Sequence, residues 1–218
     1  MNVIKSEELI NIFTLLNDQK LHYILMRNIN NELPDTLEIG KDIDILVYKK
    51  DEKKFIDFFN NNRYESIRHP FRYDTFLYGV DKFEFKYNNN NNNILFDLNF
   101  QIAVRSLDAG QWIPLDQNIQ ESAWKNRRFE KISDDFGYWT LGREDEFISL
   151  VARSIFDKKE FQSGYIKRIN ELIDLIDREN VIEKLNTVFF KFTPYLMRLL
   201  ESNNYSDIIK KYLAFREY

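Results

Sequence analysis

The sequence contains no cysteine among its 218 residues. Disulfide bonds, thiolate metal sites and a cysteine nucleophile are therefore excluded, and the composition suits a reducing cytoplasm. No apolar run approaches the roughly 20 residues that a membrane-spanning helix needs. The first residues also lack the basic and apolar stretches of a secretory signal. We therefore expect a cytoplasmic protein without a membrane segment.

Positive charge is not in excess. Lysine and arginine number 31 against 35 aspartates and glutamates, which gives a formal net charge of −4. Proteins that bind nucleic acids in general rely on clustered basic residues that face the phosphates. The balance therefore argues against long nucleic acids as partners, although it is compatible with a local basic pocket.

Apolar side chains, in contrast, are plentiful. Hydrophobic residues make up 44% and aromatic residues 16% of the chain, including 19 phenylalanines and 12 tyrosines. Such a chain can bury a real core, so an ordered globular protein is expected in spite of the many charges. The length suits one large domain or two small ones.

The first hundred residues show both helical and strand patterns. Ser6 followed by two glutamates is typical of a helix start, and the apolar helical spacing continues to residue 16. Asp51 is expected to cap a second helix, whose phenylalanines face inward and which ends at residues 60–62. Strands are predicted at residues 21–26, 42–47, 64–69, 72–80, 83–87 and 94–100, and loops at 29–39 and 88–93.

The strand at 42–47 carries the most informative pattern. Its alternation places Asp42, Asp44 and Leu46 on one face and three β-branched residues on the other. Two carboxylates two positions apart on a strand stand roughly 6 to 7 Å apart at the backbone and point the same way, so their oxygens can converge on one cation. Without a cation they repel each other beside an apolar core, which favours a functional site. We therefore expect asparagine at both positions not to lower the stability of the metal-free protein.

A third carboxylate, Asp97, lies on the more polar face of the strand at 94–100. That face lies beside Asp42 and Asp44 if the two strands are neighbours. Other interpretations stay open: the pair alone suits a charged strand edge that discourages aggregation, and Asp97 alone suits an ion pair with a lysine or arginine. The presence of all three aspartates favours catalysis.

Helical patterns dominate after residue 142. Apolar residues recur at helical spacing in 143–155, about 160–176, 181–190, 194–201 and 206–215, and a short helix is predicted at 117–125. We predict an α+β protein with a core at 1–105 and a helical C-terminal region at 106–218. Lys158, Lys159 and Arg168 are interpreted as solvated charges rather than a phosphate pocket, and His22 as structural.

These motifs resemble the polymerase-beta-type nucleotidyltransferase superfamily. The resemblance is carried by Lys-Asp-Ile-Asp-Ile-Leu-Val at 41–47 together with Asp97 on a later strand. Tyr-Ile-Leu-Met-Arg-Asn at 23–28, Phe-Asp-Leu at 96–98 and the helical stretches at 141–147 and 155–159 are similar to a bacterial branch of that superfamily. The resemblance covers most of the chain and implies a mixed sheet flanked by helices, followed by a C-terminal helical domain.

The resemblance also implies a reaction. A nucleoside monophosphate would move from a nucleoside triphosphate, such as ATP, to a small polar acceptor, for example a sugar or sugar phosphate, and pyrophosphate would be released. Asp42 and Asp44 match the residues that hold Mg²⁺ on the triphosphate, and Asp97 matches the carboxylate that helps bind the catalytic metal and activates the acceptor oxygen. Independently of the family, oxygen ligands select Mg²⁺ or Mn²⁺ over softer metals.

One part of the superfamily pattern is absent. A Gly-Ser or Gly-Gly turn usually gives the triphosphate access to backbone amides, whereas this chain has Arg27 and Asn28 at that place. Arginine can donate charge-assisted hydrogen bonds to a phosphate and asparagine tolerates a left-handed turn, so we expect Arg27, Asn28 and Lys41 to bind the triphosphate. A second hypothesis stays open, in which the fold binds a nucleotide or a protein partner without turnover.

Overall fold

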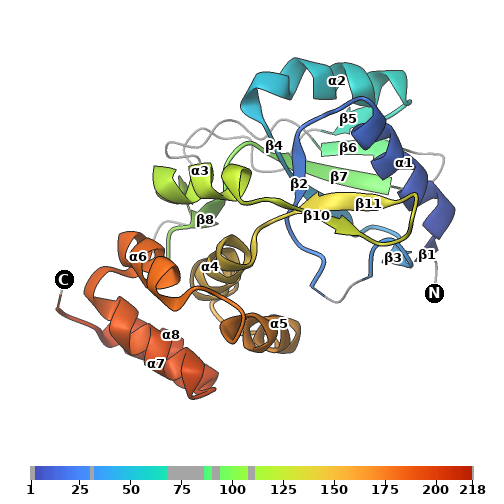
Figure 1. The fold of residues 1–218 in the computed structure, drawn as a ribbon. Coiled ribbons are helices and arrows are strands. Elements are labelled where there is room, and N and C mark those ends of the chain that lie inside the picture. The colour runs from blue at the N-terminus through green and yellow to red at the C-terminus, as the bar shows by residue number, and fades with distance from the viewer. Residues whose placement is uncertain (1–2, 30–31, 68–85, 90–93, 108–110, 218) are drawn as a thin grey trace. The chain divides into compact units, whose positions relative to one another are not determined.

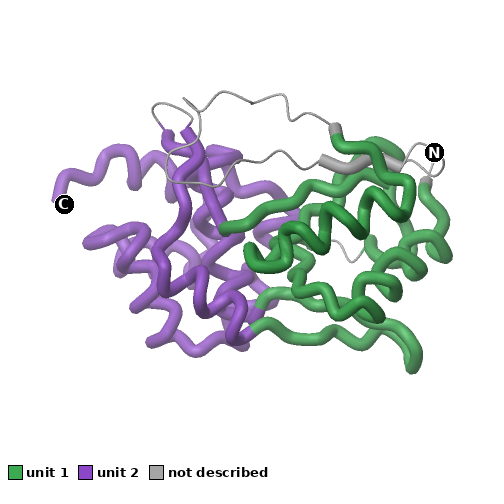
Figure 2. The backbone as a smooth tube through the Cα atoms, turned by 90° about the horizontal axis from the view of Figure 1, so that it is seen from above, with its two compact units in different colours: residues 1–101, 127–141 green, residues 102–126, 142–218 purple. Residues whose placement is uncertain are grey.

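The computed structural model describes residues 3–29, 32–67, 86–89, 94–107 and 111–217. The chain forms two compact units, each built from two stretches of sequence (Figure 2). Unit 1 comprises residues 1–101 and 127–141, and unit 2 comprises residues 102–126 and 142–218. Across the described residues, no helix combines the length and the apolar character that crossing a lipid bilayer requires.

Unit 1 is built on one mixed sheet (Figure 1). Its strands are β2 (Tyr23–Leu25), β4 (Asp42–Val47), β5 (Glu65–Ile67), β6 (Lys86–Asn89), β7 (Ile94–Asn99), β10 (Arg128–Lys131) and β11 (Gly137–Thr140). They lie in the order β10, β11, β2, β4, β7, β6, β5. The pairs β4–β7 and β11–β2 are parallel, and the other neighbours are antiparallel. The mixed sheet predicted from the sequence is confirmed.

Two helices pack on the same face of this sheet, α1 (Ser6–Asp18) and α2 (Glu52–Asn61) (Figure 1). The ring of Phe96 on β7 lies 6.3 Å from that of Phe13 on α1 and 5.2 Å from that of Phe59 on α2, measured between centroids. The apolar face of β4 belongs to the same buried cluster. Truncating one such ring to alanine costs about 3–5 kcal/mol, so this face of the sheet supports the fold.

Some short segments of unit 1 differ from the predictions. β1 (Val3–Ile4) pairs with β3 (Leu37–Glu38), so the segment 29–39 is not entirely a loop. The loop predicted at 88–93 is wrong for Asn88 and Asn89, which continue β6 and pair with β7. Backbone pairing overrides the weak strand preference of asparagine there. Residues 90–93 and the strand predicted at 72–80 lie outside the described residues.

Unit 2 is mainly helical, as predicted. Its helices are α3 (Gln117–Lys125), α4 (Arg143–Arg153), α5 (Ser163–Ile173), α6 (Arg178–Phe189), α7 (Thr193–Glu201) and α8 (Tyr205–Ala214). A π-helical turn, η3 (Ser154–Lys158), continues α4, and a 3-10 turn, η4 (Phe190–Phe192), joins α6 to α7. Two short strands, β8 (Ala103–Arg105) and β9 (Trp112–Pro114), form an antiparallel pair.

A buried ionic network joins three helices of unit 2. Asp145 on α4 is fully buried. One of its carboxylate oxygens accepts from Lys184 Nζ on α6 at 2.9 Å, and the other accepts from Ser122 Oγ on α3 at 2.9 Å. Buried charges are tolerated when they are paired and hydrogen-bonded. The network therefore has a structural role that helical periodicity does not reveal.

The domain boundary predicted at residue 105 differs from the two units. Residues 127–141 were assigned to the helical region, yet they form β10 and β11 and belong to unit 1. β11 pairs with β2, and Asn17 on α1 donates a hydrogen bond to the backbone oxygen of Gly137 at 2.8 Å from 120 residues away. Two strands of four residues show too few alternations to be recognised from the sequence.

Candidate functional site

The acidic face of β4 is the centre of the candidate site. Asp42 and Asp44 are half-buried, whereas Ile43 and Ile45 between and after them are buried in the core. Successive side chains of a strand point to opposite faces, so burial of the isoleucines turns both aspartates to the face away from α1 and α2. The period-two pattern of the sequence predicted this arrangement correctly.

Asp97 lies on the same face as the pair. β4 and β7 run in parallel, and their register places Asp44 opposite Asp97 and Asp42 opposite Leu95. Register partners point to the same side of a sheet, and neighbouring strands lie about 4.8 Å apart. Asp97 is half-buried between two buried apolar residues of β7. The structure therefore brings Asp44 and Asp97 side by side, with Asp42 two positions along β4.

Arg27 reaches this face from the end of β2. β2 is the antiparallel neighbour of β4, and the backbone amide of Met26 donates to the carbonyl oxygen of Asp44 at 3.0 Å. The Arg27 side chain binds both carboxylate oxygens of Asp44: Nε donates to Oδ2 at 3.1 Å, and the second terminal nitrogen pairs with Oδ1. Only 17% of the Arg27 side chain and 16% of the Asp44 side chain are exposed. Such two-point arginine–carboxylate pairs are among the strongest side-chain contacts.

The three aspartates have the right chemistry for a divalent cation, but their carboxylates are not gathered around one point. No group of three histidine, aspartate or glutamate side chains that could hold a metal ion occurs within the described parts of the chain. Asp44, the residue between Asp42 and Asp97, directs both oxygens to Arg27 instead. The backbone therefore places three carboxylates on one face of the sheet, and Arg27 binds the carboxylate of Asp44.

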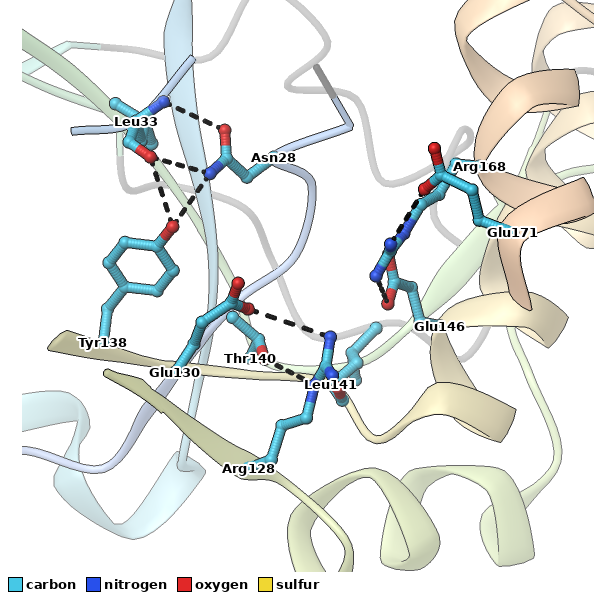
Figure 3. Close-up of polar contacts among 10 residues, drawn as sticks. All are labelled: Asn28, Leu33, Arg128, Glu130, Tyr138, Thr140, Leu141, Glu146, Arg168 and Glu171. Atoms are coloured by element: carbon cyan, nitrogen blue, oxygen red, sulfur yellow. Dashed lines mark hydrogen bonds and ion pairs between the residues drawn. The ribbon is translucent and has the colours of Figure 1, made fainter. Parts of the chain in front are cut away.

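Asn28 holds the loop that follows β2 (Figure 3). Its Nδ2 donates to the backbone oxygen of Leu33 and to the Tyr138 hydroxyl, both at 3.0 Å, and its Oδ1 accepts from the backbone amide of Leu33 at 3.1 Å. Burial raises the pKa of Tyr138, so its hydroxyl stays protonated and donates to the oxygen of Leu33 at 3.2 Å. Sequence reasoning missed Leu33 and Tyr138, because nothing local marks them as partners of Asn28.

Lys41 precedes the acidic pair and lies near the surface, with 44% of its side chain exposed. Its Nζ lies 3.1 Å from a carboxylate oxygen of Glu32 and 3.6 Å from one of Glu38. The hydrogen bond with Glu32 is the main reason why the pKa of Lys41 is raised. Lys41 is therefore a cation with acidic partners beside the start of β4.

The other charged residues considered in the sequence analysis are Arg168, Lys158, Lys159 and His22. Arg168 binds Glu146 through two nitrogens at 2.6 and 2.8 Å and Glu171 at 3.1 Å (Figure 3). Lys158 and Lys159 are exposed. In unit 1, His22 donates from Nδ1 to Asp51 at 2.5 Å.

No family model and no curated protein matches the sequence. Three solved structures are similar to this chain in fold. The antibiotic-resistance factor ANT(2'')-Ia has a TM-score of 0.50 and 10% identity, covering 93% of this chain and all of that one. The lincosamide antibiotic adenylyltransferase LnuA, solved with lincomycin bound, has a TM-score of 0.46 and 15% identity over 80% of this chain and all of that one.

A third solved structure is an antigenic nucleotidyltransferase-like protein from Paracoccidioides brasiliensis, with a TM-score of 0.44 and 12% identity over 92% of this chain and 95% of that one. At these identities the comparison concerns the fold alone. The similarity to ANT(2'')-Ia shows that this chain has a nucleotidyltransferase fold, which confirms the fold predicted from the acidic motif.

Proposed function

We propose that this protein is a metal-dependent nucleotidyltransferase that moves a nucleoside monophosphate from a nucleoside triphosphate to a small polar acceptor and releases pyrophosphate. The observation that carries the proposal is the register of β4 and β7, which places Asp44 opposite Asp97 with Asp42 on the same face. Asp42, Asp44 and Asp97 are half-buried and lie on the face of the sheet opposite the packed helices α1 and α2. Carboxylates on one face of a sheet suit a chemical role, because their oxygens are ligands for divalent cations.

Asp42, Asp44 and Asp97 are the residues that would hold the metal. Their oxygens are hard ligands, which fit Mg²⁺ or Mn²⁺ and fit softer metals poorly. When bound, such ions neutralise charge on the attacking and leaving oxygens of a phosphoryl transfer. The donor set of this face therefore suits the group that the fold implies.

The residues of the chain have separable tasks in the proposed reaction. Asp97 accepts the proton of the acceptor hydroxyl, whose oxygen forms a bond to the α-phosphorus. The bond from the α-phosphorus to the bridging oxygen breaks, and pyrophosphate leaves with its electron pair. Arg27 and Lys41 supply positive charge to the triphosphate. Asn28 holds the backbone next to Arg27 through its hydrogen bonds to Leu33 and Tyr138, and so positions Arg27 for the triphosphate.

We propose a small acceptor with a hydroxyl or phosphate group, such as a sugar or a sugar phosphate. The formal net charge of −4 makes a long polyanionic acceptor unfavourable, because nucleic-acid affinity rests on the release of counterions by clustered cations. A small molecule needs only local cations such as Arg27 and Lys41.

The test is pyrophosphate release from each of the four common nucleoside triphosphates with Mg²⁺ and a library of hydroxylated metabolites. We expect release with at least one acceptor, and a loss of about 10²–10⁴-fold in Asp97→Asn, the range for removal of a general base. Asp57→Asn is the matched control, because Asp57 is an exposed acid on α2 and far from this face.

Circular dichroism and melting curves verify that each variant is folded. Unchanged turnover in Asp42→Asn and in Asp97→Asn contradicts a carboxylate-based transfer. Tight triphosphate binding without pyrophosphate release from any acceptor supports a nucleotide-binding module in place of an enzyme.

A further inference from the structure

We propose that Arg27 is an exchangeable counter-ion of the catalytic face. It occupies the Asp44 carboxylate in the metal-free protein, and it leaves Asp44 for the triphosphate when a divalent cation binds the aspartates. The inference rests on the proposed function. It concerns the order in which Arg27 and a divalent cation bind the carboxylate of Asp44. It assigns Arg27 a role that neither the acidic motif nor the fold contains.

The geometry shows that Arg27 competes for the ligand atoms themselves. Both oxygens of Asp44 accept from the guanidinium, so a metal ion at this carboxylate would bind oxygens that already share their charge with Arg27. Asp44 is also the register neighbour of Asp97. A carboxylate held by Arg27 has to release or share that contact before it can coordinate a cation together with Asp97.

Electrostatic repulsion disfavours the binding of both cations to Asp44 at the same time. A guanidinium and a divalent cation on the same carboxylate repel each other, and the repulsion is weakly screened where only 16% of the Asp44 side chain is exposed. In the metal-free protein the same burial makes Arg27 useful, because two carboxylates on neighbouring strands otherwise face each other.

The position of Arg27 next to β4 allows its side chain to change its partner from Asp44 to a phosphate. The backbone just before it is held to β4 by the hydrogen bond from Met26 to the Asp44 carbonyl oxygen, so the exchange involves the side chain of Arg27 while this backbone contact stays in place. A guanidinium released from Asp44 can donate two hydrogen bonds to a phosphate.

The experiment measures Mn²⁺ binding to the full-length protein without nucleotide, from the electron paramagnetic resonance signal of free Mn²⁺. We expect Arg27→Gln to bind Mn²⁺ about tenfold more tightly than the wild type, the change that follows when one charge-assisted hydrogen bond no longer competes. The matched control is Arg168→Gln, which removes another half-buried two-point arginine pair, with Glu146 in unit 2. Its Mn²⁺ affinity should equal that of the wild type.

Three further measurements extend the test. The second uses the wild type alone, so the inference stays testable if Arg27→Gln folds poorly. Arg27→Lys keeps the charge but loses the planar fork, and we expect its Mn²⁺ affinity to lie between those of the wild type and Arg27→Gln. In the wild type, the Nε–H resonance of Arg27 should shift as Mg²⁺ is added and shift again with a nucleoside triphosphate. With saturating Mg²⁺, Arg27→Gln should bind the triphosphate about tenfold more weakly.

The outcomes separate this inference from the proposed function. If the wild type binds Mn²⁺ and releases pyrophosphate, but Arg27→Gln binds Mn²⁺ equally or more weakly, Arg27 orients Asp44 permanently and the exchange is overturned while transfer stands. If neither protein binds Mn²⁺ or a triphosphate, both ideas are overturned. Tighter Mn²⁺ binding together with weaker triphosphate binding supports the exchange.

Discussion

At the scale of single residues, the contact between Arg27 and Asp44 changes the expected effect of asparagine at position 44 on stability. Considered alone, Asp42 and Asp44 are like charges beside a core, so asparagine at both positions should relieve repulsion. In the structure, Asp44 is bound at both oxygens by the half-buried guanidinium of Arg27. The attraction within this pair outweighs a repulsion between carboxylates that stand two positions apart, because it acts at hydrogen-bond distance in a less exposed place.

We therefore expect Asp44→Asn to lower the free energy of unfolding of the metal-free protein by about 1–3 kcal/mol. Arg27→Gln should lower it by a similar amount. The double variant should lose less than the sum, with a coupling of about 1 kcal/mol, because the second substitution has no pair left to break. Urea unfolding in the presence of a chelator measures all four proteins.

Strictly additive losses in that cycle would mean that the contact contributes nothing to stability. An increase in stability in Asp44→Asn would restore the view that repulsion dominates on this face. Both outcomes are readable without any knowledge of the substrate.

At the scale of secondary-structure elements, Asp51 joins the start of α2 to the start of β2. It lies in the 3-10 turn η1 (Lys49–Asp51), and its side chain makes no capping hydrogen bond, which corrects the expected helix cap. Its carboxylate accepts from His22 Nδ1 at 2.5 Å and from Lys54 Nζ at 2.6 Å. Burial by itself would raise the pKa of Asp51, but these hydrogen bonds together hold it below its ordinary value.

This pKa shift predicts a pH-dependent contribution to stability. Because the carboxyl binds its proton less readily in the folded chain, its contribution is complete above the unfolded pKa of about 3.9 and is lost as the pH falls through the lower folded pKa. We expect Asp51→Asn to be less stable than the wild type by about 1 kcal/mol at pH 6. The difference in stability should shrink as the pH falls below about 4, because the carboxyl of the unfolded chain, with a pKa of about 3.9, then binds its proton.

Denaturant unfolding at a series of pH values measures this effect. Asp57→Asn is the control, because Asp57 is an exposed acid on the neighbouring helix α2. A difference between Asp51→Asn and the wild type that stays constant down to pH 3 would show that the ionised carboxylate is not what binds the two elements.

At the scale of the whole molecule, the chain leaves unit 1 after residue 101 and returns to it for residues 127–141. The returning segment supplies the strand beside β2 and part of the packing of α1. The ring of Tyr138 on β11 lies 5.7 Å from that of Phe13, and Asn17 binds the backbone oxygen of Gly137. The sheet that carries the aspartates is thus incomplete in the first hundred residues.

We expect a fragment of residues 1–101 to lack a stable sheet, whereas a fragment of residues 1–141 has all the segments of unit 1. Without β11 the amides of β2 lose a neighbour, and α1 loses apolar contacts that are worth about 1 kcal/mol or more for each buried side chain. Amide hydrogen exchange of β2 and β4 in the two fragments and the full chain measures this.

Protection of β2 and β4 in the shorter fragment equal to that in the full chain would show that the first hundred residues fold independently. It would restore the boundary predicted at residue 105. Protection that appears only in the longer fragment agrees with the two units of the structure.

The sequence by itself determined the elements whose signal is local. The alternation at 42–47 placed Asp42 and Asp44 on one face, the alternation at 94–99 did the same for Asp97, and helical spacing located α4 to α8. Such patterns are legible because backbone geometry repeats every two residues in a strand and about every 3.6 in a helix.

Only the tertiary structure decided which distant groups meet. It paired Arg27 with Asp44, joined Asn28 to Leu33 and to Tyr138 from β11, and set Asp44 opposite Asp97. No periodicity marks these contacts, because they depend on the order and register of strands that lie far apart along the chain. The acidic residues of the site can therefore be predicted from the sequence. Their counter-ion, Arg27, is known only from the order and register of the strands.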